Sequence, residues 1–116
     1  PEPEPARILS KRASFKAALD SGVTICNGSD VGVFRHGDNA RELELMVDYG
    51  MTPAHALLAA TSVNARILHM ENMIGYIKPG MLADLLPVDG DPTRDIRALR
   101  NVRAVFKNGR VVVAPR

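Results

Sequence analysis

The chain has 116 residues, enough for one ordinary domain with a single core, and a formal net charge of only +2, which does not indicate a nucleic-acid partner. Apolar residues make up 46% of the chain but aromatic residues only 4%, so the core must be built from aliphatic side chains and methionine. No run approaches the roughly 18 apolar residues of a membrane-spanning helix. We therefore expect a globular protein with a cytoplasmic location and no membrane or nucleic-acid partner.

The N-terminal quarter of the chain predicts a linker, a helix and a strand. Residues 1–5, "PEPEP", predict a linker, and residues 6–20 repeat apolar side chains at helical spacing. Residues 23–26 form a short apolar run rich in β-branched side chains, which predicts a strand buried on both faces, as in a parallel sheet. Cys26 is the single cysteine; it excludes an internal disulfide and is expected to be a small buried side chain on this strand.

Three further helices are predicted next. Asn39 can cap the first, with Glu42 in the capping-box position three residues later. Thr52 followed by Pro53 at the first helical position predicts the start of the second. Thr61 can open the last of the three, which would carry an apolar stripe of its own.

The last part of the chain predicts a small antiparallel β module. From about residue 75, glycine, proline and short β-branched runs dominate the sequence. Residues 82–89 predict a strand, although Pro87 would confine it to a sheet edge or a bulge. The pair Asn108-Gly109 between two β-branched runs is a strong signal for a type I′ hairpin.

These elements divide the chain into an α/β part and a β part. The α/β part contains a single predicted strand, and one parallel strand can neither pair its own backbone groups nor bury both of its faces. We therefore expect the 116 residues to complete their sheet with strands from another segment, another chain or a swapped copy.

The residues with chemical potential follow the predicted strand, in "GSDVGVFRHGDN". Asp30 comes directly after the strand, and in α/β folds this end of a strand is where ligands and catalytic groups gather. A carboxylate there can bind a divalent metal or act as a general base. Alternatively, Ser29 and Asp30 form an ordinary turn, with the carboxylate bonded to nearby backbone N–H groups. His36 can contact a substrate carboxylate or a metal, or can simply be an exposed loop residue.

Other candidate sites are weaker. His55 and His69 lie in terminal turns of predicted helices, where structural or solvated roles are expected. The segment "DGDPTRD" is not an EF-hand, because the sixth and twelfth positions counted from Asp89 are Arg94 and Arg100 rather than glycine and glutamate. A catalytic zinc takes three or more protein ligands, and the sequence has neither an HxH nor an HxxxH pair. Spacing alone therefore leaves one candidate ligand.

Three segments together resemble a known family: "GSDVGVFRHGDNARELELMVDYGMTPAHALLAATSVNARIL", "IGYIKPGMLADLLPVDGDPTRDI" and "VRAVFKNGRVV". Their order resembles the C-terminal part of the metal-dependent amidohydrolases, in the imidazolonepropionase-like and prolidase-like branch that includes Xaa-Pro dipeptidase. The resemblance implies that residues 6–74 are the last helix–strand unit and closing helices of a TIM-like (β/α)₈ barrel, with residues 23–28 as its eighth strand. Residues 75–116 would be the C-terminal strands of a small composite β-sandwich.

The resemblance also implies a reaction. The complete enzyme would hydrolyse a C–N bond in a small peptide or cyclic amide with water activated by one or two divalent metals, with zinc as the expected metal. Asp30 matches the family position that binds a metal and carries a proton from the attacking water to the leaving amine. His36 falls in the loop expected to contact substrate. The family's other ligands would lie upstream of Pro1, in a missing N-terminal barrel segment, so we expect the chain alone to bind no metal and to be inactive.

A second hypothesis belongs to another class. In this hypothesis the chain is a non-catalytic interaction module. Its unpaired strand and its β module pair with copies of the chain or with a partner chain. Exposed strand edges favour association, so a homo-oligomer is expected under both hypotheses.

Overall fold

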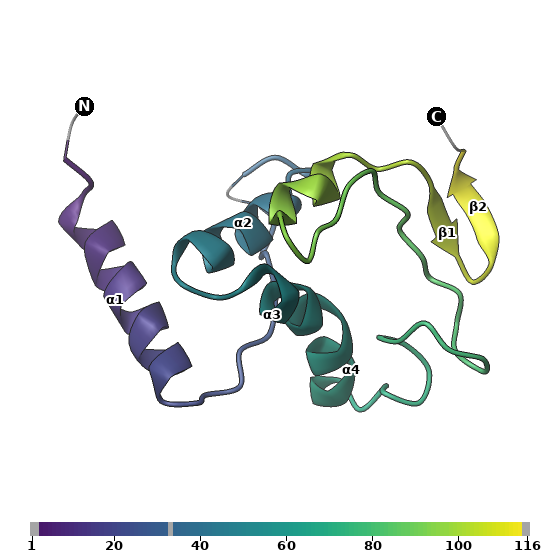
Figure 1. Ribbon diagram of the computed structural model, residues 1–116, viewed down its shortest axis with the longest axis horizontal. Coiled ribbons are helices and arrows are strands. Elements are labelled where there is room, and N and C mark those ends of the chain that lie inside the picture. The colour runs from purple at the N-terminus through teal and green to yellow at the C-terminus, as the bar shows by residue number, and fades with distance from the viewer. Residues whose placement is uncertain (1–2, 33, 115–116) are drawn as a thin grey trace.

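The computed structural model describes residues 3–32 and 34–114. Its elements in chain order are α1 (Ala6–Asp20), α2 (Ala40–Asp48), α3 (Pro53–Leu58), the π-helical η1 (Ala59–Val63), α4 (Asn64–Ile67), the 3₁₀-helical η2 (Ile96–Arg100), β1 (Val105–Lys107) and β2 (Arg110–Val113). Figure 1 shows α1 at one end of the molecule, the β1–β2 hairpin at the other, and the remaining helices between them. Across the described ranges, none of the helices combines the length and the apolar character that crossing a bilayer requires.

The segment after α1 is not a strand. Residues 23–30 have no regular secondary structure, so the strand predicted over residues 23–26 does not form within the described residues. The reason is that within residues 3–32 and 34–114 no other strand pairs with it, and an isolated strand cannot satisfy its backbone groups. Without a sheet to cover it, Cys26 is exposed rather than buried.

The helices predicted after residue 50 form one continuous rod. Thr52 caps α3 as expected, because its Oγ1 accepts a hydrogen bond from the N–H of His55 at 3.2 Å. Thr61 does not open a separate helix. It lies inside η1, and its hydroxyl donates to the carbonyl of Leu57 at 2.7 Å. The rod therefore widens by one π-helical turn at residues 59–63, and such turns often occur at functional sites.

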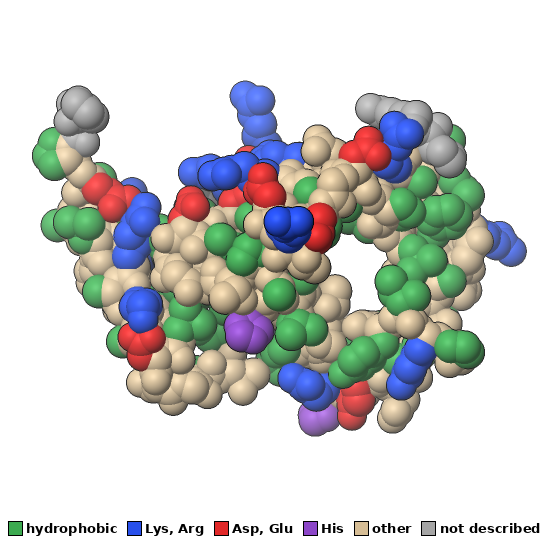
Figure 2. Space-filling view, viewed as in Figure 1, with side chains coloured by type: hydrophobic (Ala, Val, Ile, Leu, Met, Phe, Trp, Pro, Cys, Tyr) green, Lys and Arg blue, Asp and Glu red, His purple; other side chains and the backbone are tan. Residues whose placement is uncertain are grey.

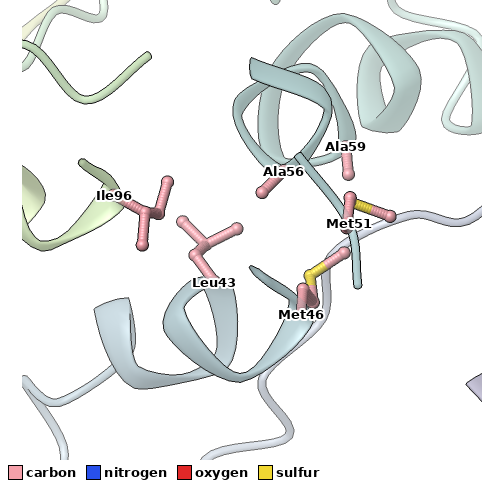
Figure 3. Packing of buried hydrophobic residues seen from close by; sticks show 6 residues of the cluster. All are labelled: Leu43, Met46, Met51, Ala56, Ala59 and Ile96. Atoms are coloured by element: carbon pink, nitrogen blue, oxygen red, sulfur yellow. The ribbon is translucent and has the colours of Figure 1, made fainter. Parts of the chain in front are cut away.

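The core lies between α2, the α3–η1 rod and η2, and consists of aliphatic and methionine side chains, as the composition predicts. Figure 3 shows Leu43 of α2 directed toward Ile96 of η2, while Met46 and Met51 lie on the side of Ala59. The six residues of this cluster are Leu43, Met46, Met51, Ala56, Ala59 and Ile96. No large side chain among the described residues is completely buried, so the core is small for a chain of this length.

Helix α1 packs against the rest of the molecule along one side. None of its residues is buried. Phe15 packs edge-on against Tyr49 with ring centroids 6.0 Å apart, and the guanidinium of Arg12 lies 4.6 Å from the centre of the same ring. The helix therefore contributes little apolar burial to the fold.

The predicted hairpin is present, but the predicted strand before it is not continuous. Asn108 and Gly109 both have positive φ, 49° and 75°, as a type I′ turn requires. Residues 82–89 make only two isolated bridges, Leu85 to Phe106 and Val88 to Val102. Pro87 lies between the bridges and has no N–H to donate, although its carbonyl accepts from Arg103 at 2.9 Å. Proline therefore interrupts the ladder where the sequence predicted an edge or a bulge.

Much apolar surface remains exposed on the C-terminal part. Figure 2 shows apolar side chains gathered over the hairpin and the segment beside it, with an opening between this region and the helices. Ile77 is 90% exposed, and Val111 and Val112 of β2 are 52% and 58% exposed.

Candidate functional site

Asp30 lies in the connection between α1 and α2 with its side chain free. The residue is exposed and has a positive φ of 44°, a conformation that aspartate tolerates better than most residues. No hydrogen bond to its carboxylate is present among the described residues, so the turn-type bonding considered for Ser29 and Asp30 is not observed at Asp30. The carboxylate therefore has no hydrogen-bond partner among the described residues.

The backbone just before Asp30 is held by the helical rod. The N–H of Asn27 donates to the carbonyl of Ala59 at 3.3 Å, and the side-chain amide of Asn64 donates to the carbonyl of Asn27 at 2.8 Å. Ala59 belongs to η1 and Asn64 begins α4, so the π-helical turn is where the connection is attached.

The first turn of α2 holds the next two residues. The N–H of Gly28 donates to Oε1 of Glu42 at 3.2 Å, and Nδ2 of Asn39 donates to Oγ of Ser29 at 2.8 Å. This corrects the predicted capping box: Asn39 occupies the N-cap position, but its side chain makes no capping bond. Both polar side chains bond to the connection that carries Asp30 instead of to their own helix.

A cavity of about 310 Å³ opens beside this arrangement. Its lining residues are Gly28, Ser29, Phe34, Arg41, Glu42 and Leu45. The lining thus combines one cation, one carboxylate and two apolar side chains, and it includes Ser29, the residue that precedes Asp30. Such a mixture suits a small polar ligand with an apolar portion.

No hydrogen bond among the described residues joins His36 to Asp30. His36 is exposed in the loop between Asp30 and α2, and no hydrogen bond of the described residues involves its side chain. His55 and His69 are also exposed, in agreement with the expected solvated roles. No group of three or more His, Cys, Asp or Glu side chains within residues 3–32 and 34–114 could hold a metal ion. A single carboxylate does not fit a catalytic metal, which needs about three protein ligands.

One polar feature was not found from the sequence. Arg100 donates through Nη1 to Oδ1 of Asp38 at 2.8 Å and forms two hydrogen bonds with Glu44 of α2. The hydrogen bond from Arg100 lowers the pKa of the Glu44 carboxyl, and the hydrogen bonds that Arg100 donates to Glu44 and Asp38 raise the pKa of Arg100. The sequence around Arg100 contains no local signal that its partner, Glu44, lies 56 residues away. Asp38 thereby anchors the far end of the Asp30 loop.

Comparison with known proteins gives consistent results. The family model described as "Amidohydrolase family" matches residues 5–112. Ochratoxinase from Aspergillus niger is 32% identical over 108 residues, which are 88% of this chain and 22% of that protein. Imidazolonepropionase from Geobacillus kaustophilus is 27% identical over 112 residues, 91% of this chain and 26% of that protein. A crystal structure of a Xaa-Pro dipeptidase with methionine bound in its active site superposes with a TM-score of 0.85 at 40% identity, covering 89% of this chain and 25% of that one. The chain thus spans about a quarter of the length of these relatives.

Proposed function

The chain belongs to the amidohydrolase family, as the sequence resemblance implied, and from this premise we propose that it forms part of a hydrolase that cleaves C–N bonds in small peptides or cyclic amides. The fold agrees with that assignment, because it is a partial α/β structure that corresponds to about a quarter of the dipeptidase chain. The observation that carries the proposal is the exposed carboxylate of Asp30, which has no partner among the described residues and follows a backbone held by two helices.

In this proposal Asp30 is the general base. Its carboxylate accepts a proton from the attacking water and returns it to the leaving amine, a role that requires an unpaired carboxylate within hydrogen-bond reach of the water. Asp30 also supplies one ligand to a divalent cation, zinc, whose other ligands lie outside the described residues, because these residues alone do not form a metal site. His36 contacts the substrate from the exposed loop that follows Asp30.

The substrate class follows from the relatives. Two of the three relatives named above are a Xaa-Pro dipeptidase, which implies a peptide substrate, and an imidazolonepropionase, which implies a cyclic amide. The cavity beside Ser29 supports small substrates, because its volume is only about 310 Å³. Arg41 in its lining can pair with a substrate carboxylate.

The remaining ligands and the cover for the apolar surface would come from the N-terminal barrel segment of the family fold. This partner is supported by three exposed apolar side chains, Ile77 and, on β2, Val111 and Val112. Covering each of them would stabilise the complex by removing apolar surface from water. The 116-residue chain alone is therefore expected to be inactive.

A chimera tests this proposal. The chain replaces the aligned quarter of the Xaa-Pro dipeptidase, and the product is assayed on Xaa-Pro dipeptides. We expect turnover, and we expect Asp30→Asn to reduce kcat by about 10²- to 10⁴-fold without unfolding the protein. Asp20→Asn, an exposed aspartate of α1 paired with Lys16, is the matched control and should leave kcat unchanged. A chimera whose turnover survives Asp30→Asn would refute the catalytic role.

A second candidate function rests on the hairpin. β2 is an edge strand with both faces exposed, and such an edge can pair with another chain in a non-catalytic assembly module. Sedimentation of the purified chain separates the two functions: a concentration-dependent dimer without turnover in the chimera favours the assembly module.

A further inference from the structure

We propose that Glu42, Asn39 and Asn64 are positioning residues that fix the backbone in front of Asp30 and so aim its carboxylate. The inference rests on the proposed catalytic role of Asp30. None of these three side chains caps its own helix, so the helices do not account for their hydrogen bonds.

Every one of the three residues that precede Asp30 is held by a different contact. Asn27 is fixed twice, by the carbonyl of Ala59 at 3.3 Å and by Nδ2 of Asn64 at 2.8 Å. Gly28 and Ser29 are fixed by the two side chains of the first turn of α2, as described above. Asp30 is the first residue beyond this series, and no hydrogen bond among the described residues reaches its carboxylate.

Of the three side chains, Glu42 is the one whose acceptor is a carboxylate. A hydrogen bond to an ionised carboxylate is roughly twice as strong as one between neutral groups. Its position in the first turn of the nine-residue helix α2 also suits a negative charge. Its second oxygen, Oε2, is buried and has no partner among the described residues, so the carboxylate is partly desolvated for the bond to Gly28.

The backbone geometry at Asp30 explains why the bonds are needed. A φ of 44° is sparsely populated for residues other than glycine, and strained conformations persist only where the surrounding structure holds them. If the bond to Gly28 is lost, Asp30 can relax toward negative φ, which turns its carboxylate away. A displacement of about 1 Å at a catalytic group can cost about 10²-fold in rate.

The first test is made on the 116-residue chain by NMR. In Glu42→Ala we expect the Gly28 amide to exchange about tenfold faster and the amide-to-Hα coupling of Asp30 to change, because the charge-assisted bond is gone. Glu42→Gln keeps an acceptor oxygen and should restore both values. Glu71→Ala is the matched control, a partly buried glutamate that also has a buried Oε2 without a partner but makes no hydrogen bond to residues 27–29.

The second test uses the chimera and distinguishes positioning from general stabilisation. Glu42→Ala should lower kcat by about 10²-fold with KM unchanged, and Glu42→Gln should recover most of it. Unchanged Gly28 exchange, Asp30 coupling and kcat in Glu42→Ala would overturn the inference, and so would a glutamine variant as defective as the alanine variant. The outcome for Asp30→Asn judges the proposed function separately, because the amide measurements do not depend on turnover.

Discussion

Glu44 of α2 and Arg100 of η2 form a bidentate ion pair, with Nη2 of the arginine 2.9 Å from Oε2 of the glutamate and Nε bonded to Oε1. Glu44 follows Leu43 on α2, and Figure 3 shows Leu43 directed toward Ile96 of η2, the helix that carries Arg100. Because Arg100 also holds Asp38, one guanidinium links three segments. The orientation of the Asp30 loop therefore depends on a residue 70 positions later in the sequence than Asp30.

The ion pair predicts a loss of stability in acid. The hydrogen bond from Arg100 lowers the pKa of Glu44 below its ordinary value of 4.5. A carboxyl with a lower pKa in the folded state stabilises the fold above the unfolded pKa, and this contribution disappears as the pH falls through the folded pKa. We expect the free energy of unfolding, measured by urea titration at a series of pH values, to fall below about pH 4.5. Glu44→Gln should flatten part of this fall.

Asp84 and Asp91 also have lowered pKa values, so their titration remains in the Glu44→Gln variant. Arg100→Lys provides the second comparison. Lysine keeps the charge but cannot form the two-pronged contact, so we expect an intermediate acid dependence. Wild-type acid dependence in Glu44→Gln would show that the ion pair contributes nothing to it.

Asp84 predicts a local effect at the hairpin turn. Its Oδ1 accepts from the N–H of Asn108 at 2.7 Å and its other oxygen accepts from Lys107. These bonds lower its pKa, the one from Lys107 most. We expect Asp84→Ala to make the Asn108 amide exchange about tenfold faster while amides of α2 are unaffected. Hydrogen exchange followed by NMR measures this directly.

The control for the hairpin is Asp89→Ala. Asp89 forms a looser ion pair with Arg103, 3.4 Å apart, and makes no contact with the turn. If both aspartate variants change Asn108 exchange equally, the effect is a general loss of stability and the turn contact is not responsible.

Local features of the fold were predictable from the sequence, and contacts across it were not. The Thr52 cap and the Asn108-Gly109 turn depend on neighbouring residues, so their sequence signals were sufficient. The strand predicted over residues 23–26 does not form within the described residues, because a strand depends on its partners, which apolar periodicity does not report. Pro87 was recognised as an interruption, but only the structure shows that it leaves two isolated bridges.

The candidate site shows the same division. Spacing suggested Asp30 as a candidate ligand but left turn chemistry open, and the catalytic role that we propose for it came from the family resemblance. Glu42 was assigned to a capping box because a glutamate three residues after Asn39 fits that pattern. In the structure its partner is Gly28, 14 residues earlier, and a local pattern carries no information about such a contact.

Among the described glycines, Gly75 is the position where we expect an added methyl group to lower the stability of the fold most. It has a φ of 88°, and an added Cβ would lie 2.7 Å from the Cβ of Ala65 and 3.0 Å from the carbonyl oxygen of Thr61. Ala65 is completely buried, so it cannot move aside without disturbing the rod. We expect Gly75→Ala to lower the free energy of unfolding by about 2–4 kcal/mol, measured by urea titration, through strain and overpacking.

Gly80→Ala separates the two causes. Gly80 has nearly the same φ, 89°, but an added Cβ would meet nothing within 4 Å, so only the conformational cost of about 1–2 kcal/mol is expected. Because η1 and α4 hold Asn27, Gly75→Ala should also accelerate exchange at the Asn27 amide, whereas Gly80→Ala should not. Equal losses of stability in the two variants would mean that the rod accommodates the extra methyl group and that close packing at Gly75 does not support the Asp30 connection.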